Sequence, residues 1–230
     1  MSRTLYDLQG ADDRRYSPYC WRIRLALAHK GLQFDTVPVR FCDKELLAFS
    51  GQIRVPVLTD GDTTVFDSWD IACYLEDTYP DRPSLFGGAI GRGTARFVND
   101  WSDGVLNPAL LKMIIMDVFH NLEPVDREYF RASREKRFGA RLEDVQAGRE
   151  ERLPAFRHSL APVRAVIEAQ PFLCGDQPAY ADFIVFSVFQ WGRCMSEFTL
   201  LAADDPLCAW RSRMLDLFGG MAREAKGYPC

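Results

Sequence analysis

The sequence lacks the patterns that mark metal sites and disulfide frameworks. It contains only three histidines, and its seven cysteines show no C-x-x-C spacing. Zinc sites and redox-active cysteine pairs need closely spaced ligands of these two types. We therefore expect no metal, and we do not favour a disulfide reductase. An odd number of irregularly spaced cysteines is typical of reduced thiols in a cytoplasmic protein.

Long apolar runs and an excess of positive charge are also missing. No run of about 18 apolar residues could cross a bilayer, and the N-terminal residues have no signal-peptide core. The net charge is −4, which argues against nucleic acid or acidic membranes as partners. The glycines near residue 90 match no phosphate-binding loop. We therefore expect a cytoplasmic protein that binds neither nucleic acid nor membranes.

The 230 residues are enough for two domains. Residues 1–80 have the order β-α-β-α-β-β-α, which predicts a mixed sheet with helices packed on it. Residues 81–93 are rich in proline and glycine and are predicted to be a linker. Residues 94–230 are helical in pattern. Within them, the charged stretch 122–152 predicts a solvated helical excursion, and the apolar stretch 179–191 predicts a central, buried helix.

Residues 17–31, S-P-Y-C-W-R-I-R-L-A-L-A-H-K-G, predict a helix with both ends marked. Ser17 is a favoured N-cap, Pro18 suits the first helical position, and Gly31 fits the residue after the last turn. A helix N-terminus favours an anion, such as a thiolate. From this stretch alone, Ser17 is explained equally well as a simple cap and as a group that stabilises a bound thiolate.

Three further local features predict details of the helices. We predict that Ser68 caps the last helix of the first domain, residues 68–80. Spaced apolar residues over 153–167 predict one helix that Pro162 bends. Asp182, at the start of the buried helix, is expected to accept N–H groups of the helix's first turn.

Several motifs together resemble the glutathione transferases: S-P-Y-C at the first helix, V-P before the hairpin and D-S before the third helix. The resemblance covers nearly the whole chain. The stretches R-E-Y-F-R-A-S-R-E (127–135) and R-L-E-D-V-Q-A-G-R-E-E-R-L-P (141–154) are most similar to the bacterial glutathione-dependent β-aryl etherases and related fungal enzymes. S-P-Y-C-W-R also resembles the zeta class, which includes maleylacetoacetate isomerases. The resemblance implies a thioredoxin-like α/β domain, an all-α second domain and a homodimer.

The resemblance also implies roles around the sulfur of glutathione. Ser17 falls on the catalytic serine, whose hydroxyl would hydrogen-bond that sulfur. Val55 falls on the residue whose backbone pairs with the cysteinyl unit, and Pro56 on the family's cis-proline. Tyr6 is an alternative to Ser17, because other classes use a tyrosine near that position. We favour Ser17, since it also meets the geometry of a helix start.

The two ends of glutathione have their own candidates. Asp67 and Ser68 fall on the family's pair for the γ-glutamyl end. A carboxylate at Asp67 suits an α-ammonium, and Ser68 with a helix N-terminus suits a carboxylate. Lys44 and Arg54 are weaker candidates for the glycyl carboxylate.

The resemblance implies a transferase whose co-substrate is glutathione and whose thiolate attacks a hydrophobic or aromatic electrophile, such as a β-aryl ether. The alternatives are a glutathione-dependent cis–trans isomerase and a non-catalytic binding protein. The electrophile should lie between the domains. Methionines and aromatic residues at helical spacing are more typical of a core than of a binding wall. The residues concerned are Met113, Met116, His120, Trp191, Cys194 and Met195.

Overall fold

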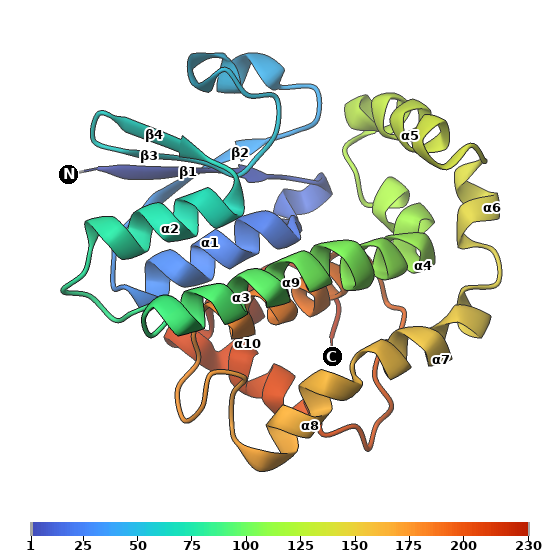
Figure 1. The fold of residues 1–230 in the computed structure, drawn as a ribbon. Helices are drawn as coiled ribbons and strands as arrows, with labels where there is room; N and C mark the ends of the chain where they lie inside the picture. Colours follow the sequence, from blue (N-terminus) through green and yellow to red (C-terminus); the bar gives the residue numbers. More distant parts are fainter. Residues whose placement is uncertain (1, 230) are drawn as a thin grey trace.

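The computed structural model describes residues 2–229, with a sheet in the N-terminal part and helices in the rest (Figure 1). The strands form one sheet in the order β2-β1-β3-β4, in which β1 and β2 are parallel and β3 is antiparallel to both neighbours. The predicted order of elements is confirmed, and the second helix is a short 3-10 helix, η2. The bounds are β1 Arg3–Leu8, the 3-10 turn η1 Ala11–Asp13, α1 Pro18–His29, β2 Asp35–Val39, η2 Lys44–Ser50, β3 Val57–Asp60, β4 Thr63–Phe66 and α2 Ser68–Thr78.

The two faces of the sheet are covered by different elements. Successive side chains of a strand point to opposite faces. Leu5 accordingly belongs to the main core with residues of α1 and α2, whereas Tyr6 packs against a smaller cluster that includes Leu47 of η2. Figure 1 shows α1 and α2 between the sheet and the helical domain, and η2 on the other side.

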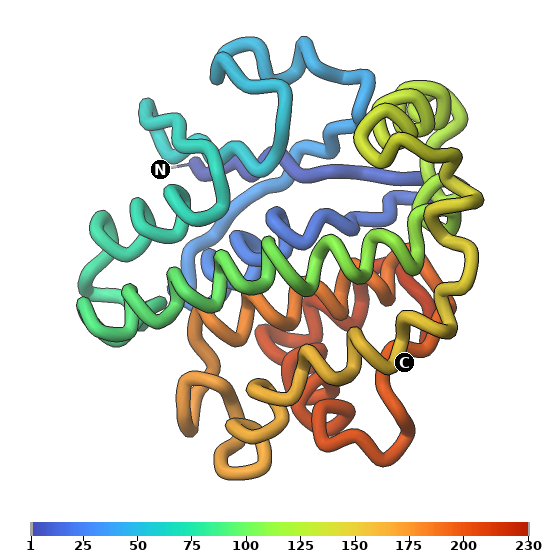
Figure 2. The backbone as a smooth tube through the Cα atoms, turned by 45° about the vertical axis from the view of Figure 1, so that its right-hand side comes forward, coloured from blue at the N-terminus to red at the C-terminus, as the bar shows by residue number. Residues whose placement is uncertain are grey.

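The helical domain is arranged around α9, whose residues are all buried except Arg193. This confirms the predicted central helix, which packs against α1, α3 and α4. Figure 2 shows α5 and α6 at the edge of the molecule, away from α9. Within residues 2–229, no helix combines the length and hydropathy of a membrane span. The bounds are α3 Ala89–Trp101, the π-helical η3 Ser102–Leu106, α4 Asn107–His120, α5 Pro124–Phe138, α6 Leu142–Gln146, α7 Arg149–Ser159, α8 Ala161–Ala169, α9 Tyr180–Met195 and α10 Leu207–Glu224.

A buried carboxylate fixes the start of α9. Asp182 accepts the N–H groups of Leu173 at 2.7 Å and Ala179 at 3.3 Å and the indole N–H of Trp210 at 3.0 Å. Burial raises the pKa of Asp182, and these donors oppose the shift. The expectation that Asp182 accepts N–H groups of the first turn is wrong in its donors. The donors come from the cap residue and the preceding loop, so Asp182 also ties that loop and α10 to α9.

Helix α3 begins at Ala89, inside the segment predicted to be a linker. A glycine is required at Gly91, because a Cβ atom there would lie 1.8 Å from the carbonyl oxygen of Phe86. The first turn of α3 therefore packs directly on the backbone that precedes it. The glycines that allow this contact also remove the apolar periodicity by which a helix is recognised in sequence.

The prediction of one bent helix over 153–167 is wrong. Helix α7 ends at Ser159 and α8 begins at Ala161. Pro162 lies in the first turn of α8, where its missing N–H would have no partner within the helix. The seam of apolar residues continues across the break because Phe156 of α7, Leu160 between the helices and Val163 of α8 lie in the same core.

Candidate functional site

Three of the residues predicted to bind glutathione follow or precede strand ends that lie side by side in the sheet. Val57 of β3 pairs with Tyr6 of β1 and with Phe66 of β4. The end of β1, the start of β3 and the end of β4 are therefore neighbours. The chain reaches Ser17 after the first of these strands, Pro56 before the second and Asp67 after the third.

Ser17 caps α1 and is 4% exposed. Its Oγ accepts the backbone N–H of Cys20 at 3.3 Å. A hydroxyl that accepts one bond still has its own proton to donate. Ser17 can therefore donate to an anion bound at the N-terminus of α1, where the helix dipole also favours negative charge.

Cys20 cannot supply a nucleophile at this corner. Its side chain is fully buried, and burial raises the pKa of its thiol well above the usual value. The nearby carboxylate of Asp7 raises that pKa further. Because the thiolate is the reactive form, the corner offers the Ser17 hydroxyl and no protein thiolate.

The Val55–Pro56 peptide bond is cis, as the resemblance implies for this position. Pro56 is buried directly before β3, and Val55 is half-buried. Tyr6, the alternative to Ser17, packs its ring against Phe49 with the centroids 5.0 Å apart. Tyr6 thus lies on the η2 side of the sheet, opposite the face on which α1 packs.

Asp67, and not Ser68, is the cap of α2. Its Oδ1 accepts the N–H groups of Trp69 at 2.8 Å and Asp70 at 3.4 Å. Its backbone has a φ of 67°, which is uncommon outside glycine and occurs often at ligand sites. The prediction that Ser68 caps this helix is wrong, because the positive φ of Asp67 places the Asp67 carboxylate over the first turn. Ser68 becomes the first helical residue, and its carbonyl oxygen accepts the hydroxyl of Tyr180 at 2.9 Å.

Lys44 and Arg54 are both exposed on the segment between β2 and β3. The ammonium of Lys44 lies 4.5 Å from the centroid of the Tyr129 ring, which belongs to α5. A contact of this kind is a cation–π interaction. The structure therefore brings Lys44, from the N-terminal half, against a helix of the C-terminal half.

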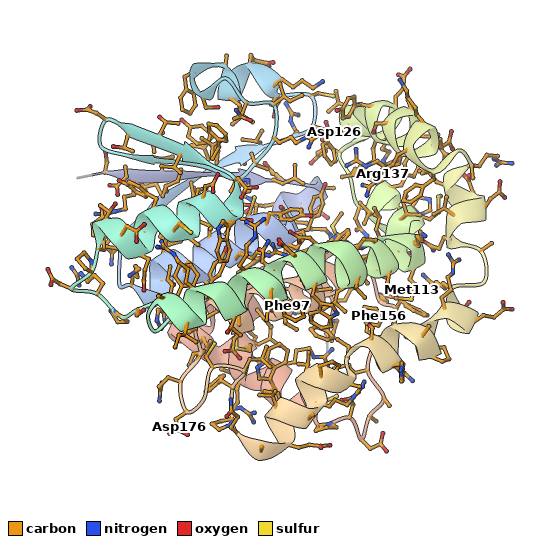
Figure 3. The ribbon with its side chains drawn as sticks, in the orientation of Figure 1. Phe97, Met113, Asp126, Arg137, Phe156 and Asp176 are labelled. Carbon is orange, nitrogen blue, oxygen red and sulfur yellow. The ribbon has the colours of Figure 1, made fainter. Side chains whose placement is uncertain are left out.

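Helix α5 docks on the loop that follows β2. Oδ1 of the buried Asp126 accepts the N–H of Cys42 at 3.0 Å. The ring of Phe41 lies 5.8 Å from that of Phe130, between centroids, and the Arg134 guanidinium lies 5.1 Å from the Phe41 ring. Figure 3 labels Asp126 on α5. The charged stretch forms helices as predicted, but α5 also packs against the N-terminal half, which the charge pattern did not indicate.

Most of the candidates for the second-substrate wall are core residues, as their helical spacing favoured. Four are buried, namely Met113, Trp191, Cys194 and Met195. His120 and Met195 line a polar cavity of about 610 Å³ together with Asn121 and Tyr228. That cavity is lined by none of the residues predicted to bind glutathione. Across residues 2–229, no group of three or more His, Cys, Asp or Glu side chains is placed to hold a metal.

Comparisons with known proteins agree with this geometry. Residues 16–78 match the model of the glutathione S-transferase N-terminal domain, and residues 94–200 match that of the C-terminal domain. A glutathione S-transferase-like protein of Aspergillus flavus is 28% identical over 141 residues, which are 55% of this chain and 50% of that protein. The chain thus spans about half the length of that curated relative.

Two solved structures cover almost the whole fold. Glutathione transferase GSTFuA3 from Phanerochaete chrysosporium superposes with a TM-score of 0.83 at 26% identity, over 93% of this chain and 96% of the other. CsGST63524 of Ceriporiopsis subvermispora, solved in complex with glutathione, gives a TM-score of 0.80 at 25% identity, over 95% and 96%. The chain matches the models of both domains and shares its fold with both solved structures. It therefore belongs to the glutathione transferase superfamily.

Proposed function

We propose that this protein uses glutathione as its co-substrate and that the glutathione thiolate attacks an aromatic electrophile held between α1 and α5. The observation that carries the proposal is the buried Ser17 hydroxyl, which caps α1 and keeps a proton to donate. A thiol is mostly protonated near neutral pH, and only the thiolate is a good nucleophile. The hydroxyl and the helix dipole would both lower the pKa of the bound thiol.

The rest of glutathione would be held at the same sheet edge. One oxygen of Asp67 is occupied by the cap, and the other remains for the α-ammonium. The γ-glutamyl carboxylate would lie at Ser68 and the N-terminus of α2. The backbone of Val55 would pair with the cysteinyl unit. Lys44 and Arg54 would meet the glycyl carboxylate.

Within this function, we favour cleavage of β-aryl ethers. One of the two stretches that resemble the etherases, residues 127–135, lies within α5, and its Tyr129 contacts Lys44, a candidate glutathione residue. The thiolate would form a C–S bond at the β-carbon of an α-carbonyl aryl ether. The C–O bond would break, and the electron pair would leave with the phenolate, which takes a proton from water.

The test is a panel of a β-aryl ether ketone, an aryl halide and maleylacetoacetate, each incubated with glutathione and with the wild type or Ser17→Ala. We expect phenol release from the ether and loss of most turnover in the variant. Unchanged turnover in Ser17→Ala would refute the role of Ser17. Failure to bind immobilised glutathione would favour a non-catalytic member of the fold.

A second candidate is cis–trans isomerisation, which S-P-Y-C-W-R at the start of α1 supports. Glutathione would add to a cis double bond, allow rotation and leave. Product analysis separates the two reactions, because isomerisation consumes no glutathione and a transferase consumes one molecule for each product.

We also propose a cytoplasmic homodimer. Exposed apolar side chains are available for an interface, since Phe97 is 72% exposed and Ile90 is 90% exposed. Analytical ultracentrifugation of the purified chain measures the mass directly, and a monomer at micromolar concentration would contradict the proposal.

A further inference from the structure

The two faces of α5 differ in how their charges are neutralised. Arg131 forms ion pairs with Glu135 and Glu143, both at 2.9 Å. Arg134 and Arg137, on the same helix, pair with no carboxylate of the part of the chain that the structure describes. Arg134 bonds only to the Ser133 hydroxyl, at 2.9 Å. One face of α5 is therefore neutral and another is cationic.

Arg134 lies where an unpaired cation is costly. Its guanidinium lies over the rings of Phe41 and Phe130, at 5.1 and 4.8 Å. Burial lowers its pKa, Tyr16 and Tyr129 oppose that shift, and the nearby charges of Arg137 and Arg54 add to it. Neighbouring positive charges repel one another strongly where water is partly excluded. An anion bound between them offsets this repulsion.

The corner before α1 faces this cluster. Tyr16 is 4% exposed, and its hydroxyl has no hydrogen-bond partner among the described residues. The charges of Arg134 and Asp126 act on this hydroxyl, and the charge of Arg137 acts on the hydroxyl of Tyr19. Figure 3 labels Arg137 on α5. The cationic cluster thus adjoins the residues on either side of Ser17 and Pro18, next to the expected position of the sulfur.

The carboxylates near this corner form no ion pair with the two arginines. Asp103 is paired with Arg22 at 2.7 Å, and Oδ1 of Asp126 accepts the backbone N–H of Cys42. The two carboxylates of glutathione are already assigned to Ser68 with the α2 N-terminus, and to the segment that carries Lys44 and Arg54. Arg134 and Arg137 therefore remain without an anion.

We propose that Arg134 and Arg137 bind a carboxylate or a similar anionic group on the electrophile, so that the second substrate is an anionic aromatic compound. The inference rests on the proposed glutathione-dependent function and adds the class of its substrate. Arg134 supplies a planar donor fork that is preorganised by two aromatic rings, which suits a carboxylate. Arg137 supplies a second, more exposed charge.

The test compares two electrophiles of similar shape, of which only one carries a negative charge. One is a chlorodinitrobenzoate with the carboxylate para to chlorine, and the other is the corresponding carboxamide. In both, the thiolate forms a C–S bond at the carbon that carries chlorine, chloride leaves with the electron pair, and the thiol proton goes to solvent. Each kcat/KM is divided by the uncatalysed rate constant with glutathione, which removes the difference in intrinsic reactivity.

For the wild type, we expect the normalised kcat/KM of the carboxylate to exceed that of the carboxamide about tenfold, the effect of one charged hydrogen bond. Arg137→Gln and Arg134→Met should bring this ratio close to one, and Arg134→Lys should restore part of it. Lys136→Gln removes one charge from the neighbouring position and should leave the ratio unchanged. Arg137 is exposed, so its variant keeps the test valid if Arg134→Met fails to fold.

Three results would count against the inference in different ways. A wild-type ratio near one, or a ratio that the arginine variants do not change, overturns it. An increase in the KM for glutathione that is equal with both electrophiles would show that the arginines serve glutathione, and it also overturns the inference. If the wild type accelerates neither reaction, the proposed transferase function is contradicted, and the inference that rests on it falls too. A direct measurement of glutathione binding then shows whether the co-substrate site exists.

Discussion

The two sides of the Ser17 corner are built in different ways. On the sheet side, the proposed glutathione contacts come from helix caps and a turn, at Ser17, Val55–Pro56 and Asp67. Each is determined by a few adjacent residues. On the α5 side, the contacts come from long side chains, such as Arg134 and Tyr129, which are positioned by a helix far along the chain.

This difference shows how one scaffold separates two tasks. Caps and turns leave little freedom, so the sheet side suits an invariant ligand such as glutathione. Side chains on a peripheral helix can change without disturbing the central helices, so the α5 side suits a variable substrate. The two sides are joined by few contacts, including Asp126 with Cys42, Phe41 with Phe130 and Arg134, and Tyr129 with Lys44. Substitutions can therefore affect one side at a time.

The largest effect is expected for Ser17→Ala. Loss of one donor to a developing anion lowers kcat about 100-fold, whereas the affinity for glutathione should change little. Steady-state kinetics and the ultraviolet absorbance of the bound thiolate measure both. Tyr6→Phe is the matched control, because Tyr6 lies on the other face of the sheet. Loss of activity in Tyr6→Phe with normal activity in Ser17→Ala would mean that Tyr6, and not Ser17, hydrogen-bonds the sulfur.

The next effect is expected at the junction of the two sides. Asp126→Ala leaves the N–H of Cys42 without its acceptor, which costs about 2 kcal/mol of unfolding free energy. Chemical denaturation measures this loss. Asp126→Asn keeps an oxygen for the same bond and should lose less. Equal stability of Asp126→Ala and the wild type would mean that α5 is not held by this contact.

A smaller effect is expected at the γ-glutamyl end. Asp67→Asn preserves a capping oxygen and tolerates the positive φ, but it removes the charge that would meet the α-ammonium. We expect the KM for glutathione to rise about tenfold, with the melting temperature nearly unchanged. Asp62→Asn, at the exposed hairpin turn, is the control for loss of one negative charge. An unchanged KM in Asp67→Asn would remove Asp67 from the site.

The smallest effect is expected for Lys44→Met. Exposed ion pairs and cation–π contacts each contribute little, so the KM for glutathione should rise about threefold. Tyr129→Leu frees the Lys44 side chain without removing its charge and should have a weaker effect on the same KM. If Tyr129→Leu has the stronger effect, Lys44 depends on α5 for its position, and the two sides are more closely coupled than their few contacts indicate.

Much of this protein could be predicted because its signals are local. The cap at Ser17, the hairpin before α2 and the apolar α9 each depend on a few neighbouring residues, and each was found in the sequence. The misplaced cap of α2 and the hidden start of α3 show the limit of this approach. The first depends on the backbone angle of Asp67, and the second on the contact of Gly91 with Phe86.

The sequence by itself determined the order of the elements and the central helix, because hydrophobic periodicity and capping act over a few residues. The candidate glutathione residues came from the resemblance to a family. Only the tertiary structure decided what the charged stretch does. Ion pairing with Glu135 and Glu143 neutralises Arg131, whereas Arg134 packs against Phe41 without an ion pair and acts on Tyr16. Charge in a sequence does not reveal its partner, since that partner is set by long-range packing.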